Sequence, residues 1–129
     1  MSDIVGIWRM VESRARDDAG APLPPSFGPD GMGLVQFHPE GRMMCVLSDS
    51  RPTLPDDRPR DYASYGGAYR YDGKTLVTRV DITADPRRMG GDEVREVRFE
   101  GDRLVLTPPP QPFGGALRHR ELVWERIAR

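Results

Sequence analysis

Apolar and polar residues alternate with a period of two along most of the chain, which is the pattern of half-buried strands. No segment of ten residues or more keeps the 3.6-residue period of a helix. The alternation predicts eight strands, which we place at residues 4–15, 32–37, 42–48, 67–71, 75–82, 93–99, 103–107 and 116–127. A single helical turn is expected at residues 61–65.

The connections between the predicted strands alternate between short and long. Tight turns such as Asp72-Gly73 join pairs of strands as hairpins. Longer connections rich in proline and glycine follow the other strands, at residues 17–31, 49–60, 84–91 and 108–115. Eight sequential antiparallel strands can close on themselves, and closure removes exposed sheet edges. We therefore expect an all-β single domain over residues 1–129, an eight-stranded antiparallel up-and-down barrel with a central cavity and a mouth formed by the long connections.

Composition and charge narrow the class of protein. Charged residues make up 30% of the chain but nearly cancel, leaving a net charge of -1, so we expect neither nucleic acid nor a membrane as partner. A single cysteine excludes an intramolecular disulfide, and the first residues lack the pattern of a secretory signal. The expectation is a cytoplasmic protein, monomer or homodimer, with no cofactor and no metal, because no motif for either is present.

Five short motifs occur in a characteristic order along nearly the whole chain: Val5–Val11 with its Gly6-Ile7-Trp8, Pro39–Met43, Tyr65–Tyr69, Val94-Arg95 followed by Phe99–Leu104, and Val123–Arg126. Together they resemble the bacterial lipocalin-like domains, a branch of the calycin-type β-barrels. The resemblance implies a barrel with a pocket, and a Trp8 that packs at the closed end beneath Arg126. It implies no single reaction, since such domains share a fold and not an activity. The histidine that they often carry in the fifth strand is replaced by Thr78 and Arg79.

Arg95 is the residue that points most directly to binding. It alternates with Val97 and Phe99, whose apolar face should point into the barrel, and it follows a long connection near the mouth. A buried arginine needs a carboxylate partner or an anionic ligand. Glu12, near the mouth end of the first strand, is the expected partner if the pair is structural. The alternative is that Arg95 recognises an anion or carboxylate.

Other apolar and aromatic residues complete the expected cavity. Four tyrosines lie within ten residues, which suits a pocket for an aromatic molecule but equally suits ordinary barrel packing. We expect Cys45 to be buried and inert, and Val80 and Ile82 to face inward, which leaves Arg79 and Asp81 as a surface pair. The candidate ligand-binding residues are Met10, Glu12, Met43, Tyr65, Tyr69, Tyr71, Arg95 and Phe99.

Three functions are consistent with this pattern. The leading hypothesis is binding of a small hydrophobic or aromatic molecule in the barrel cavity, with a carboxylate as the group that Arg95 would recognise. The alternative is a cofactor-independent cyclase or isomerase acting on a small natural-product-like substrate in the same cavity, with Glu12 or His119 as acid–base candidates. The third is a barrel filled by its own side chains that serves as an interaction or structural module.

Overall fold

Antiparallel strands build almost all of the molecule in the computed structural model, which describes residues 3–129. Within these residues there are nine strands and two short 3-10 helices. The strands are β1 (Gly6–Arg16), β2 (Met32–Phe37), β3 (Arg42–Ser48), β4 (Tyr62–Tyr71), β5 (Thr75–Thr83), β6 (Asp92–Glu100), β7 (Arg103–Thr107), β8 (Gln111–Phe113) and β9 (Ala116–Ala128). The 3-10 helices are η1 (Pro55–Asp57) and η2 (Pro86–Arg88).

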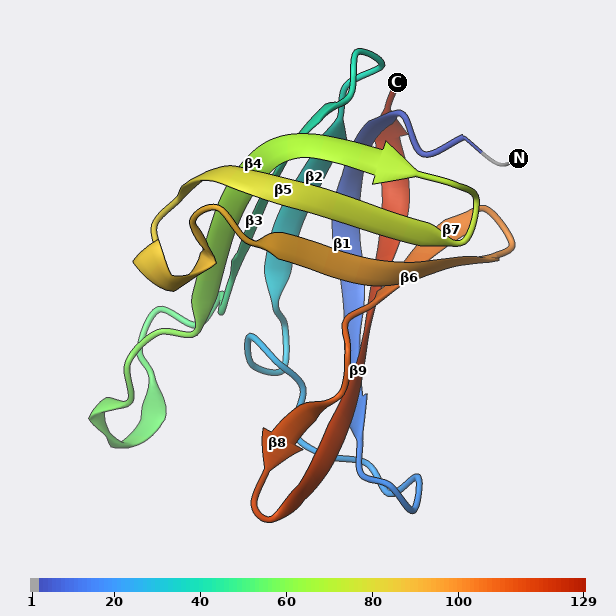
Figure 1. The fold of residues 1–129 in the computed structure, drawn as a ribbon. Coiled ribbons are helices and arrows are strands. Elements are labelled where there is room, and N and C mark those ends of the chain that lie inside the picture. The colour runs from blue at the N-terminus through green and yellow to red at the C-terminus, as the bar shows by residue number, and fades with distance from the viewer. Residues whose placement is uncertain (1–2) are drawn as a thin grey trace.

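Eight of these strands close into a barrel. Each strand from β1 to β6 pairs with the next, β7 pairs with β9, and β9 returns to pair with β1 (Figure 1). The short β8 pairs only with the first residues of β9, so it extends the wall at one end without joining the closed ring. The predicted all-β, eight-stranded antiparallel barrel is therefore confirmed, and β8 is an addition within the connection expected at residues 108–115.

The strand boundaries differ most from expectation at the start of β4, and elsewhere by one or two residues. The helical turn predicted at residues 61–65 is wrong, because β4 already begins at Tyr62 and pairs with β3 from its first residue. The backbone amide of Asp49 donates to the carbonyl of Asp61 at 2.9 Å, which carries this pairing one step beyond the strands. The tertiary pairing with β3 decides the conformation of this segment, as it commonly does where local propensity is weak.

The closed end of the barrel is organised around Trp8, which is 1% exposed. Its indole Nε1 donates to the carbonyl of Ile4 at 2.9 Å, and the Arg126 guanidinium lies 4.3 Å from the centre of a Trp8 ring. The cation–π contact implied by the family resemblance is thus present. A guanidinium over an indole contributes about 0.5–2 kcal/mol, and here it joins β1 to β9 where the barrel closes.

A bulge in β1 changes which face Glu12 occupies. Met10 pairs with Trp124, but the next pair is Glu12 with Val123, so Val11 is an extra residue in the strand. One extra residue reverses the alternation beyond it. Glu12 therefore lies exposed on the outer face of the barrel. The sequence pattern had predicted that Glu12 shares the inward face with Met10.

A second bulge reverses the end of β5. Gly67 pairs with Val80, whereas the adjacent Gly66 pairs with Ile82. Val80 is buried as expected, but Ile82 faces solvent, so the inward placement of Ile82 was wrong. Arg79 and Asp81 are both exposed as expected, but they do not pair with each other. Arg79 contacts Asp92 at 2.6 Å, and Asp81 contacts Arg42 on β3.

Gly6 is required by the geometry of closure. Its φ is +132°, and a Cβ added there would lie 2.5 Å from the carbonyl oxygen of Ala128. We expect Gly6→Ala to lower the free energy of unfolding by about 1–3 kcal/mol, because the strained backbone and the clash both act on the β1–β9 seam. Urea unfolding followed by tryptophan fluorescence measures the change. Gly91→Ala is the control, since Gly91 has no positive φ and a Cβ there meets nothing nearer than 3.4 Å. Equal effects of the two substitutions would contradict this account.

Candidate functional site

The long connections gather at one end of the barrel and line an open pocket of about 580 Å³. The β1–β2 connection, the β3–β4 connection and the β8–β9 hairpin all contribute, and they lie together at the lower end in Figure 1. Apolar walls come from Pro24, Pro25, Pro29, Leu54, Pro59 and Phe113. Charged groups come from Asp49, Arg51, Arg58, Arg60, Asp61 and Arg118. Ligand pockets in proteins commonly combine such walls with a few convergent polar groups.

Asp49 holds the mouth loops together. Its side chain is 3% exposed and accepts hydrogen bonds from the Arg51 amide at 3.0 Å and from the Arg51 guanidinium at 2.7 and 3.1 Å. Arg60 donates to the carbonyls of Asp49 and Arg51, both at 2.7 Å. Asp61 accepts from the amide of Phe27 at 3.0 Å and so ties the β1–β2 connection to the start of β4.

Positive charge at the mouth exceeds negative charge. Arg51 is neutralised by Asp49, but Arg60 bonds only to backbone carbonyls, and within residues 3–129 Arg58 has no carboxylate partner. Arg118 donates to the side-chain oxygen of Gln111 and lies 5.0 Å from the ring centre of Phe113. Its charge is therefore held on a neutral amide and an aromatic face and remains available to an anion.

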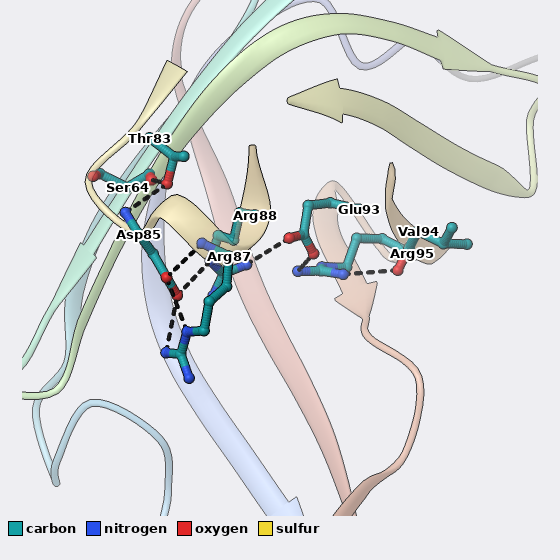
Figure 2. A network of polar contacts seen from close by, with 8 residues as sticks. All are labelled: Ser64, Thr83, Asp85, Arg87, Arg88, Glu93, Val94 and Arg95. Carbon is teal, nitrogen blue, oxygen red and sulfur yellow. Dashed lines mark hydrogen bonds and ion pairs between the residues drawn. The ribbon is translucent and has the colours of Figure 1, made fainter. Parts of the chain in front are cut away.

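Figure 2 shows how two further arginines are held beside this mouth. Glu93 bridges them, with Arg88 at 2.8 Å and Arg95 at 3.2 Å from its two carboxylate oxygens. Arg88 is the last residue of η2, which Asp85 caps at its N-terminus. The Arg88 guanidinium lies 5.5 Å from the ring centre of Tyr65. One carboxylate thus serves two guanidinium groups.

The inward placement of Arg95 is confirmed, but its expected partner is wrong. The Arg95 side chain is 14% exposed and its carboxylate contact is Glu93, two residues earlier on the same face of β6. Glu12 instead pairs with Arg14 at 3.1 Å on the outer face, where Arg14 also contacts Glu100 at 3.0 Å. The bulge at Val11 is the physical reason. The period-two pattern of residues 93–99 does contain the signal that Glu93 accompanies Arg95.

Arg120 is the candidate-site residue that the sequence analysis missed. It shares the inward face of β9 with Leu122 and Trp124, and its Nε is buried with no hydrogen-bond partner anywhere in residues 3–129. Burial lowers the pKa of Arg120, and the neighbouring charges of Arg118, Arg95 and Arg88 lower it further. Asp61 opposes this lowering only in part, and a partly buried charge whose neighbours are mostly of the same sign is costly. The alternation of arginine at 118 and 120 with Leu122 was the available signal.

Tyr65 and Cys45 lie beside the arginines, at the inner end of the site. Both are buried, and they face each other across paired positions of β4 and β3. Burial raises the pKa of the Cys45 thiol to about 12, although Arg95 and Arg88 partly oppose that rise. Burial also raises the pKa of the Tyr65 hydroxyl. Both groups therefore remain neutral, and Cys45 is not a thiolate nucleophile.

The remaining candidate residues lie elsewhere. Met10 and Met43 are buried in the core. Tyr69 packs edge-on against Phe37, and its hydroxyl donates to the carbonyl of His38 in the β2–β3 turn. Tyr71 and Phe99 are half-buried against the core just before turns at this same closed end. Of the eight predicted ligand-binding residues, the structure brings Tyr65 and Arg95 together at the arginine cluster.

The acid–base candidates do not face the barrel interior. His119 lies on β9 and contacts Asp18 of the β1–β2 connection at 2.7 Å. Glu12 is on the outer face for the reason given above. The structure therefore places neither candidate inside the barrel, and their part in acid–base chemistry stays a prediction. Within residues 3–129, no group of three or more histidine, cysteine or acidic side chains is placed to hold a metal ion.

Comparison with known proteins assigns the chain to no family, so the protein is described by its fold. The chain matches no protein-family model, and no curated protein is similar to it. The closed, eight-stranded antiparallel barrel is consistent with a calycin-like fold. Nowhere in residues 3–129 is there a helix that is both long and apolar enough to cross a membrane.

The Asp49 contacts make an acid-dependent contribution to stability. Hydrogen bonds from Arg51 lower the pKa of Asp49 from the ordinary 3.8 to about 2. Between these two pH values the unfolded chain binds the proton before the folded protein does, so stability falls as the pH falls. We expect wild type to melt at a higher temperature than Asp49→Asn near neutral pH, with the difference disappearing as the pH falls from about 3.8 to about 2.

Circular dichroism melts from neutral pH down to pH 2 measure this difference. Asp102→Asn, in the exposed turn between β6 and β7, is the control for loss of a carboxylate. A difference between wild type and Asp49→Asn that did not change with pH would show that the carboxylate charge is not what holds the loops.

Proposed function

We propose that the protein binds a small hydrophobic or aromatic molecule that carries a carboxylate, with the acid group held by the arginines at the barrel mouth. The observation that carries the proposal is the buried Nε of Arg120, which has no hydrogen-bond partner among residues 3–129 and lies among Arg88, Arg95 and Arg118. An anionic ligand would supply the missing counter-ion, and the planar guanidinium group suits a carboxylate in a two-point contact.

The local charge favours an anion over a neutral molecule. The four arginines face Glu93, which is shared by two of them, and Asp61, whose carboxylate already accepts from the Phe27 amide. The chain as a whole has a net charge of -1, so this excess of positive charge is a property of the site and not of the molecule. Such a local field attracts anions to a concave surface.

The apolar part of the ligand has a place in the open mouth pocket next to the arginine cluster. Arg118 lines that pocket and is a charged neighbour of Arg120, whereas Arg88, Arg95 and Arg120 lie outside its lining. Prolines from two connections and the ring of Phe113 line the mouth, and Tyr65 lies beneath Arg88. The pocket volume of about 580 Å³ falls within the range of about 300–1,000 Å³ that is usual for small-molecule sites. The pairing of arginine with an aromatic ring recurs here, at Arg118 with Phe113 and at Arg88 with Tyr65.

We also propose that the protein is a lipocalin-like barrel of the calycin type and that it acts in the cytoplasm. The ordered motifs and the contact between Trp8 and Arg126 support the lipocalin-like assignment. A single free cysteine, buried as Cys45, suits a reducing compartment.

Isothermal titration with aromatic acids tests the proposal. The probes are benzoate, cinnamate and naphthalene-2-carboxylate, each compared with its uncharged amide. We expect at least one acid to bind and its amide to bind more weakly. Arg120→Gln should weaken binding of the acid by about 10- to 100-fold, since a charge-assisted hydrogen bond contributes about 1.5–3 kcal/mol. Arg103→Gln, at the exposed start of β7, is the matched control. Equal affinity for acid and amide, or no binding of any acid, would overturn the proposal.

The ligand-free protein offers an independent test of the unpaired charge. We expect Arg120→Met to raise the free energy of unfolding by about 0.5–2 kcal/mol, because an apolar side chain of similar length removes a partly buried charge that has no ion-pair partner among residues 3–129. Arg95→Met should lower it, since it breaks the contact with Glu93. Denaturant unfolding of the two variants measures both changes. A loss of stability in Arg120→Met equal to that in Arg95→Met would count against an unsatisfied Arg120.

A further inference from the structure

A broad apolar patch covers the outer face of four adjacent strands, away from the arginine cluster. β2, β3, β4 and β5 lie side by side in the barrel wall (Figure 1). Six large apolar side chains on them are each between 49% and 58% exposed, which is half of the twelve such exposed residues on the described chain. We call this the outer patch; its members are Met32, Leu34, Met44, Val46, Tyr62 and Ile82.

Strand register makes the outer patch continuous. Leu34 on β2 pairs with Val46 on β3, and Met44 on β3 pairs with Gly66 on β4, which in turn pairs with Ile82 on β5. Directly paired residues project from the same face of a sheet at close spacing. The bulge in β5 is what brings Ile82 to this face. Exposed apolar patches of this kind mark interaction surfaces in soluble proteins.

The outer patch contains a hollow as well as protruding side chains. A shallow pocket of about 310 Å³ opens between Met44 on β3 and Ile82 on β5. Val46 and Ser64 form another part of its wall. The protruding Leu34 lies on the neighbouring strand. A surface that offers both a hollow and apolar side chains to fill one can complement itself about a two-fold axis.

The charges around the outer patch are internally paired. Arg42 and Asp81 form two contacts of 2.5 and 2.9 Å beside Met44 and Ile82, and Arg87 contacts Asp85 at 3.0 Å beyond Ile82. A partner with a strongly acidic or basic surface gains little from such a neutral rim. A second copy of the chain brings the same neutral rim and the same apolar centre.

The closed barrel and the size of the patch favour face-to-face packing of two copies. Closure leaves β2 to β5 with neighbours on both sides, so a second copy cannot add to their edges. Six half-exposed apolar side chains present on the order of 500 Å², at the upper end of the largest patch on a typical monomer. With its rim, the patch approaches the about 800 Å² per partner of a standard interface.

We propose that the protein forms a two-fold homodimer in which the outer patches of two copies pack against each other. Apolar side chains of each copy enter the hollow between Met44 and Ile82 of the other, and the two walls pack as aligned sheets do. None of the six outer-patch residues lines the mouth pocket. The proposed dimer and the proposed anion site are therefore tested independently of each other.

Sedimentation velocity of the wild type and of Val46→Glu tests the dimer. We expect wild type to shift from monomer to dimer as its concentration rises through the micromolar range. Val46→Glu should weaken the dimer by about 100-fold or more, because the axis brings two buried charges of the same sign together. Met89→Glu is the control, since Met89 is similarly exposed but lies on the connection after η2, outside the outer patch. It should dimerise as wild type does.

Ile82→Glu provides the second variant, and circular dichroism melts establish that each variant is folded. Both patch variants should be monomeric at concentrations where wild type and Met89→Glu are dimeric. A wild type that stays monomeric at about 100 µM would overturn the proposal, and so would folded patch variants that dimerise as tightly as wild type. Binding of aromatic acids should be the same in monomeric and dimeric forms, which keeps this test separate from that of the arginine site.

Discussion

The pairing of β1 with β9 is the constraint on which the rest of the molecule depends. It joins the first strand to the last and converts a twisted sheet into a barrel without free edges along its main wall. Gly6 permits the close approach of the two strands, while Trp8 and Arg126 hold them together at the closed end. Closure gives the barrel an interior and an outer face. A charged side chain on the outer face is solvated, whereas one in the interior needs a partner.

Bulges then determine which residues face each side. In β1 the extra residue Val11 sends Glu12 outward to join a network of charges that includes Arg14 and Glu100. In β5 a second irregularity turns Ile82 toward solvent and leaves Val80 in the core. Bulges concentrate near functional features in β proteins because they redirect side chains. Here one bulge removes a carboxylate from the interior, and the other adds an apolar side chain to the outer patch.

The removal of Glu12 leaves the interior short of negative charge. Glu93 is shared between Arg88 and Arg95, and Arg120 has a buried Nε without a partner in the described chain. Folding energy alone would not favour such an arrangement, since an apolar side chain at Arg120 would cost less to bury. Proteins keep costly local features at sites of function. This imbalance, beside a mouth with apolar walls, connects the fold to the proposed recognition of an organic acid.

The sequence by itself determined the class of fold, the strand order and the inward face of β6. Alternation with a period of two and turn residues between the runs were sufficient, because both are local consequences of strand geometry. The closed end around Trp8 could also be predicted from its motif. Only the tertiary structure decided that β4 begins at Tyr62, that Glu12 and Ile82 face outward, and that Arg118 and Arg120 join Arg95. These features depend on the register between strands that are distant in sequence, and a single extra residue in one strand reverses a face without any local signal.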